Sequence, residues 1–210
     1  MKTLQFTSLL LLIGLTSCDL FDSTQTNPKM GGSQSVIGNV GNTFTIGSTS
    51  GANGFKAEVK SLEDGVSTIT GSVNVTDPTI LEMLKSIPDL TVSGNTVSAT
   101  KKYRITDEGI QSVYPEGNFT MVKYDDKVGD AYSIKINGEK RTRELEYKST
   151  TDDYGWGFMD IKVMKVGETG RKIPGVSKLE YILNHKFGMV GFKAYFEDGS
   201  SKEVRFFSKN

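Results

Sequence analysis

Apolar and polar residues alternate along most of this chain, and that two-residue period is the feature that most restricts its fold. Residues 55–60 read Phe-Lys-Ala-Glu-Val-Lys, and residues 69–75, 97–105 and 190–196 repeat the pattern. A two-residue period places one face of a β-strand in a core and the other face in water. The pattern therefore predicts about ten β-strands in the chain.

Short links between the expected strands indicate how those strands are arranged. Asn137-Gly138 predicts a type I′ β-hairpin, because both central residues of that turn need a positive φ angle. Asp198-Gly199 predicts a second turn of this kind. Short links favour antiparallel neighbours over parallel strands joined by helices. We expect a mainly β fold, in which an antiparallel meander forms a curved sheet, a half-barrel or a sandwich.

One segment departs from the two-residue period. Its apolar residues have helical spacing, and they are Ile80, Leu81, Leu84 and Ile87. Asp77 suits the N-cap and Pro78 the first helical position, while Pro88 ends the segment. We expect one short helix at about residues 77–87, lying across an end or an open face of the sheet.

The first 35 residues differ in composition from the remainder. Lys2 precedes an apolar stretch at residues 6–15, which is too short to cross a membrane and is typical of a signal peptide. Residues 18–35 are rich in small polar residues and predict a flexible tether. Residues 36–210 are then expected to form a single β-rich domain. The alternative is two small β domains that divide near residues 125–128.

The end of the leader carries a specific motif. Leu15-Thr16-Ser17-Cys18 resembles the lipobox of bacterial lipoproteins, and the chain contains no second cysteine. The resemblance implies that residues 1–17 are removed and that Cys18 carries acyl chains such as palmitate. Acyl chains would anchor the protein to a membrane while its body stays in water. The resemblance implies a location in the bacterial cell envelope, and we favour the outer membrane over the inner membrane.

Charge and residue counts argue against several classes of site. Lys plus Arg and Asp plus Glu both number 25, so no basic excess points to nucleic acid. One His and one Cys leave little material for a metal site, and no residue spacing supplies His185 with a nucleophile and an orienting carboxylate. We therefore expect no metal site, no cofactor and no enzymatic activity. His185 is expected to pack on the core side of its strand. The acidic pairs at 125–126, 152–153 and 197–198 are expected in solvated turns.

A cluster of aromatic residues is the first candidate binding site. In a regular strand, Tyr154, Trp156 and Phe158 share a face opposite to Met159 and Ile161. Three clustered aromatic rings outside the main core would suit a sugar or a partner protein. Two alternatives would bury Trp156: a β-bulge at Gly155 or Gly157 that re-registers the strand, or covering of the cluster by the predicted helix.

Two arginines form the second candidate site. A two-residue turn at Asn137-Gly138 pairs Ile134 with Arg141 and Tyr132 with Arg143. Directly paired residues share a face of the sheet, so both arginines would lie on the apolar side. There they would suit the mouth of a cavity that holds an anion. The alternative is a bulge that turns both side chains to solvent.

These patterns favour a non-enzymatic envelope lipoprotein that acts as a binding or assembly module for an envelope protein or a glycan. The alternative function is a carrier of a lipid or another apolar ligand in a half-barrel cavity. A carrier needs a continuous apolar cavity of several hundred Å³. An assembly module needs an exposed apolar patch of more than a few hundred Å².

Overall fold

The computed structural model describes residues 27–47 and 51–209, and the leader and Cys18 lie outside them. The described residues form fifteen β-strands, one α-helix and one short 3₁₀ helix. The helices are η1 (Val36–Gly38) and α1 (Pro78–Lys85). The strands are β1 (Thr43–Ile46), β2 (Ala52–Glu63), β3 (Val66–Val75), β4 (Thr91–Ser93), β5 (Thr96–Ile105), β6 (Gly109–Tyr114), β7 (Gly117–Lys123), β8 (Ala131–Ile136), β9 (Glu139–Lys148), β10 (Tyr154–Trp156), β11 (Met159–Ile161), β12 (Met164–Thr169), β13 (Val176–Asn184), β14 (Gly188–Phe196) and β15 (Ser201–Lys209).

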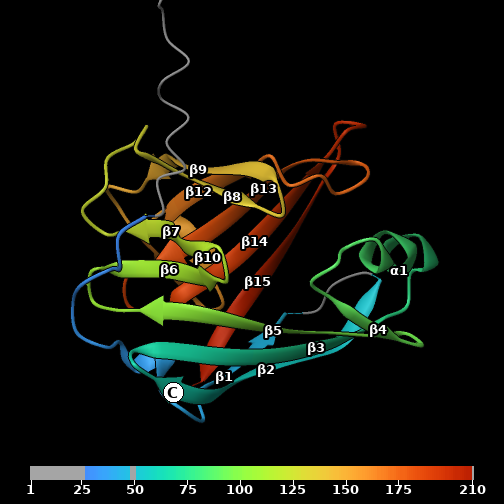
Figure 1. The fold of residues 1–210 in the computed structure, drawn as a ribbon, viewed down its shortest axis with the longest axis horizontal. Coiled ribbons are helices and arrows are strands. Elements are labelled where there is room, and N and C mark those ends of the chain that lie inside the picture. Colours follow the sequence, from blue (N-terminus) through green and yellow to red (C-terminus); the bar gives the residue numbers. More distant parts are fainter. Residues whose placement is uncertain (1–26, 48–50, 210) are drawn as a thin grey trace, which may run out of the picture.

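Thirteen of the strands form one antiparallel sheet, whose order is β7-β6-β5-β3-β2-β1-β15-β14-β13-β12-β9-β8, with β4 paired to β5. In Figure 1 the strands β2, β3 and β5 form one wall and β13, β14 and β15 form the other. The two terminal strands of the sheet, β7 and β8, also contact each other. The sheet is therefore nearly closed into a barrel, which confirms the expected antiparallel half-barrel.

The halves before and after the β7–β8 link share this one sheet through the pairing of β1 with β15. That link lies where the sequence allows a boundary between two small domains. The side chain of Asn27 also bridges β7 and β8, the two edge strands of the sheet. Its amide donates to the Ser133 carbonyl oxygen at 3.1 Å, and its side-chain oxygen accepts from the Thr120 amide at 2.9 Å. Asn27 thus satisfies backbone groups that the two edge strands leave unpaired.

The expected tether is wrong for its described part. Met30 is buried, and its backbone N–H donates to the side chain of Gln111 at 3.1 Å. Residues from Asn27 onward therefore belong to the folded body. The polar composition of this segment led to the prediction of a tether. In the structure, however, polar side chains such as Asn27 and Gln111 satisfy buried backbone groups, so a polar segment can belong to the folded body.

The helix lies where the sequence predicts it. The Asp77 carboxylate caps α1 by accepting from the backbone N–H groups of Thr79 at 2.8 Å and Ile80 at 3.1 Å. No residue of α1 is fully buried. Figure 1 shows α1 at one end of the barrel, beside β4.

The two predicted turns differ in outcome. Asn137 has φ 51° and Gly138 has φ 81°, which confirms the predicted turn between β8 and β9. At Asp198-Gly199 only Gly199 has a positive φ, of 83°, so the prediction of a second turn of this kind is wrong. The link between β14 and β15 spans residues 197–200, and extra loop residues remove the need for a second positive φ.

Both faces of β13 are buried, which a single barrel core would not explain. Tyr181 and Leu183 belong to a large cluster inside the barrel, whereas Ile182 belongs to a second cluster. That second cluster includes Tyr154 and Trp156 from the small β10–β11 hairpin. The hairpin therefore covers the outer face of β13 and neighbouring strands.

Candidate functional site

The interior of the barrel contains an apolar cavity of about 370 Å³. Side chains from both walls line it, and Ser72, Ser98, Lys101 and Tyr103 are the polar residues among them. The other lining residues are Ile37, Phe44, Phe55, Ala57, Ile69, Gly71, Val73, Leu84, Leu90, Val97, Ala99, Ile105, Ile110, Met121, Gly188, Met189 and Phe206. Such a lining favours an apolar ligand over a polar one.

Small residues on three neighbouring strands make this cavity possible. Ala57 on β2 pairs with Gly71 on β3, and Gly71 pairs with Ala99 on β5. A Cβ atom added at Gly71 would lie 3.1 Å from the Cβ of Ala57, so these three residues are closely packed within the sheet. Their side chains, however, extend only a short distance into the barrel. The missing side-chain volume leaves the space that larger residues would fill.

The helix α1 and the loop after it cover one end of the cavity. Leu84 of α1 and Leu90 of the loop both line it. At this end Asp89 accepts a hydrogen bond from the Lys101 ammonium at 2.8 Å. That bond lowers the pKa of Asp89 against the effect of burial, and the positive charges of Lys101, Arg171 and Arg141 lower it further.

A second, polar recess of about 240 Å³ adjoins the apolar cavity. Lys101 and Tyr103 line both spaces, and Asp89, Ser112 and Tyr114 line the recess together with the remaining residues Thr100, Lys102, Val113 and Pro115. Burial raises the pKa of Tyr103 to about 12, so its hydroxyl stays protonated at neutral pH. The two spaces together offer an apolar chamber with a polar end.

The structure confirms the predicted register of the two arginines. Ile134 pairs with Arg141 and Tyr132 with Arg143, and the β8–β9 ladder runs without a bulge. Both arginines are buried, at 8% and 1% exposure, so the alternative that a bulge turns them to solvent is wrong. Because side chains alternate along a strand, Arg141, Arg143 and the core residue Leu145 share the inner face of β9.

Arg143 belongs to a fully partnered network. Its Nε donates to Glu168 at 2.7 Å, and its Nη1 donates to the Ser112 hydroxyl at 3.1 Å and the Phe119 carbonyl oxygen at 3.0 Å. The guanidinium carbon also lies 3.9 Å from the centre of the Phe119 ring. These contacts tie β9 to β6, β7 and β12, which is a structural role.

Glu168 is the shared acceptor in this network. It accepts from the Arg171 guanidinium at 2.8 Å and the Tyr181 hydroxyl at 3.0 Å, in addition to Arg143. Burial alone would raise the pKa of Glu168, but the charges of Arg143 and Arg171 outweigh that effect and lower it. Arg141 differs, because its buried Nε and Nη1 have no hydrogen-bond partner among the described residues.

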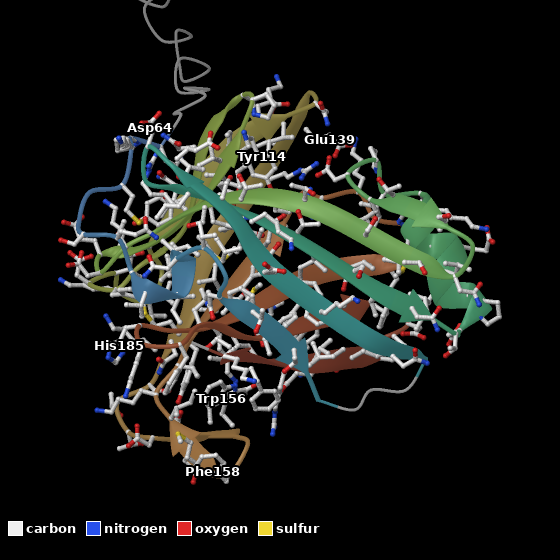
Figure 2. The ribbon with its side chains drawn as sticks, turned by 90° about the horizontal axis from the view of Figure 1, so that it is seen from below. Asp64, Tyr114, Glu139, Trp156, Phe158 and His185 are labelled. Atoms are coloured by element: carbon white, nitrogen blue, oxygen red, sulfur yellow. The ribbon has the colours of Figure 1, made fainter. Side chains whose placement is uncertain are left out.

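The three aromatic residues do not form one surface cluster. Trp156 is buried, its Nε1 donates to the Phe206 carbonyl oxygen at 2.7 Å, and its ring stacks on Phe207. Tyr154 is also buried, whereas Phe158 is 95% exposed. The strand reverses at Gly157-Phe158, so a hairpin turn, not a bulge, separates these side chains. Figure 2 shows Phe158 at the hairpin tip and Trp156 nearer the sheet.

The prediction for His185 is wrong. The residue is exposed in the turn after β13, and its ring lies edge-on to Tyr124 with centroids 6.3 Å apart. The strand ends at Asn184, whose side-chain oxygen accepts from the next turn's amides and stops the alternation. The acidic pairs occupy turns or loops, as predicted, but the expected solvation is wrong for Asp126. It is buried, and its carboxylate accepts from the Lys123 amide and the Tyr132 hydroxyl. In the described residues no group of three or more His, Cys, Asp or Glu is placed to hold a metal ion.

Comparisons with known proteins add one distant likeness. No protein family matches the chain, and no curated protein does either. A crystal structure from Bacteroides fragilis, described as a "putative exported protein with YmcC-like fold", gives a TM-score of 0.43 at 10% identity, over 82% of this chain and 97% of that chain. These values establish neither a family nor a function. Within the part that the structure describes, no helix is long and apolar enough to cross a membrane.

Proposed function

We propose that this protein is a cell-envelope lipoprotein whose body binds a small apolar molecule inside its half-barrel and carries it without chemical change. The observation that carries this proposal is the apolar cavity of about 370 Å³. This volume lies within the range of about 300–1,000 Å³ that small-molecule sites occupy. The geometry thus favours the carrier function over the assembly module that the sequence alone favours.

The lipobox supports the location in this proposal. Acylation of Cys18 would hold the body beside a membrane, where apolar ligands partition. We propose the outer membrane as the site of attachment. Cys18→Ser should release the protein from the membrane fraction and abolish labelling with radioactive palmitate, while circular dichroism of the body stays unchanged. Equal labelling of both proteins would refute the anchor without affecting the cavity.

A neutral fluorescent probe, N-phenyl-1-naphthylamine, tests the cavity. Its fluorescence should rise on binding to the wild-type body. Ala99→Phe should weaken binding by about tenfold or more, because a phenyl ring on β5 would occupy the space that the probe needs. Thr70→Phe is the matched control. Thr70 lies between the cavity-lining residues Ile69 and Gly71, so its side chain points to the opposite, outer face of the sheet, where its hydroxyl forms a hydrogen bond with Thr100.

The expected outcome is saturable binding that Ala99→Phe weakens and Thr70→Phe preserves. Binding that both variants weaken equally would place the probe outside the cavity. Absence of saturable binding to the wild type would overturn the carrier function.

A role as an assembly module is the second candidate, because Phe158 is 95% exposed and neighbouring Met159 is partly exposed at the hairpin tip. Exposed apolar side chains at a tip suit a pocket in an envelope protein. A photo-crosslinking amino acid at position 158 should capture one defined envelope protein from intact cells. The same group at Lys56, an exposed residue of β2, should not.

A further inference from the structure

Arg141 is a buried arginine close to the polar recess, although it does not itself line that space. Arg141 is 8% exposed, and neither its Nε nor its Nη1 has a hydrogen-bond partner among the described residues. A buried charge is costly unless it is paired, so such an arginine calls for an anion. Arg143, two residues along the same face, makes hydrogen bonds to three residues, so it requires no external anion.

The charges around Arg141 do not balance. The charged residues that line the recess are Lys101, Lys102 and Asp89, and the charges of Arg141 and Arg171 also act on Asp89. Arg143 and Arg171 share Glu168, Lys101 pairs with Asp89 and Lys172 pairs with Glu139. Lys102 and Arg141 therefore have no ion-pair partner among the described residues. The net charge of the whole chain is zero, so this local excess is a property of the site.

The basic end and the apolar cavity are continuous. Lys101 and Tyr103 line both the cavity and the polar recess. Ser112 lines the recess, and its hydroxyl accepts a hydrogen bond from Arg143. Asp89 also lines the recess, and the positive charges of Arg171 and Arg141 lower its pKa. Tyr114 of the recess packs against the cluster of Phe119, Ile134 and Ile136, and Ile134 pairs with Arg141 across the β8–β9 ladder.

We propose that the ligand is an anionic amphiphile, whose apolar chain fills the cavity and whose carboxylate or phosphate head lies in the polar recess, where Lys101 and the nearby charge of Arg141 attract it. This inference rests on the proposed function and adds the class of ligand. A guanidinium suits both head groups, since it presents planar N–H donors and stays charged. Lys101 provides a second positive charge at the junction of the two spaces.

Three probes of equal chain length test this inference by displacing N-phenyl-1-naphthylamine at pH 8: dodecanoate, dodecyl phosphate and 1-dodecanol. The two anionic probes should displace it at concentrations about tenfold lower than the neutral alcohol. Arg141→Met should abolish that preference and leave the affinity for 1-dodecanol unchanged, because methionine keeps the apolar volume without the charge. Arg141→Lys should retain part of the preference.

Two controls separate the site from general electrostatics. Lys140→Met removes a positive charge from the exposed residue that precedes Arg141 on β9 and faces the other side of the sheet, and it should leave the preference intact. Acetate and inorganic phosphate, which have the head group without the chain, should displace little of the probe. Strong inhibition by inorganic phosphate would identify a free anion, and not a lipid head group, as the occupant.

The outcomes distinguish the two proposals. Equal affinity for the alcohol and the anions in the wild type would overturn the anionic ligand and leave the apolar carrier intact. Failure of all three probes to displace the dye would overturn both. A preference that Arg141→Met leaves unchanged would overturn the role of Arg141.

Discussion

The interior of one barrel is built in two ways. Around Leu145 and Leu183, large apolar side chains and the Arg143–Glu168 pair fill the space. Beside α1 the lining strands carry small residues, and a cavity remains. The same sheet supports both ends, so the difference comes from side-chain volume and not from backbone architecture.

This contrast separates stability from function within one fold. Filled interiors contribute most of the stability of a domain, because buried apolar contacts are lost on unfolding, and a buried ion pair is costly to break because the remaining charge has no partner. A hollow end forgoes part of that stability, and proteins keep such space where a ligand occupies it. Substitutions at the filled end should therefore change stability, and those at the hollow end should change binding.

Glu168→Gln at the filled end should have the largest effect. It leaves the buried charges of Arg143 and Arg171 without their carboxylate, and loss of one partner of a buried pair costs about 3–5 kcal/mol of unfolding free energy. Urea denaturation at pH 7 measures the loss. A loss below about 1 kcal/mol would show that this end is not held by its ion pairs.

The same substitution predicts a pH dependence. The pKa of Glu168 in the folded protein is lowered, so its contribution to stability is present above the ordinary glutamate pKa and is lost as pH falls through the lowered value. The wild type should therefore lose stability below about pH 4, while Glu168→Gln loses less, and the two should converge.

Leu183→Ala should have the next largest effect. Leu183 is fully buried in the interior cluster, and removal of such a side chain costs about 2–5 kcal/mol because a void remains. The measurement is again urea denaturation. Affinity for N-phenyl-1-naphthylamine should stay within about twofold of the wild type, since Leu183 does not line the cavity.

Part of this contrast was predictable from local patterns. The capping residue Asp77 and the Asn137-Gly138 turn act through neighbouring atoms, so the helix and the register of Arg141 and Arg143 followed from sequence. The cavity did not, because Ala57, Gly71 and Ala99 lie on three strands and become neighbours only in the sheet. Small residues at corresponding strand positions were the available signal.

The hairpin that holds Trp156 shows a second limit. Its aromatic residues continue the two-residue alternation, and the sequence lacks a common turn dipeptide at Gly157-Phe158. The reversal is stabilised by tertiary contacts, since Trp156 packs on Phe187 and Phe207 from distant strands and loops. Local propensity does not report such contacts.

Ala99→Phe at the hollow end should raise the unfolding free energy, whereas the substitutions at the filled end lower it. The added ring fills existing space, so the unfolding free energy should rise by about 0.5–2 kcal/mol while binding of N-phenyl-1-naphthylamine weakens. Thermal and urea denaturation measure the change in stability, with Thr70→Phe as the control. A destabilisation of several kcal/mol would mean that this end is as tightly packed as the other, and the contrast would fail.

Leu84→Ala should have the smallest effect on stability. Leu84 is only partly buried on α1, and no residue of that helix is fully buried, so the loss should be under about 1 kcal/mol. Binding of N-phenyl-1-naphthylamine should weaken several-fold, because Leu84 lines the end of the cavity that α1 covers. Glu82→Ala, an exposed change on the same helix, is the control. If Leu84→Ala lowers stability and leaves affinity unaltered, α1 acts as part of the packed core and the division between the two ends disappears.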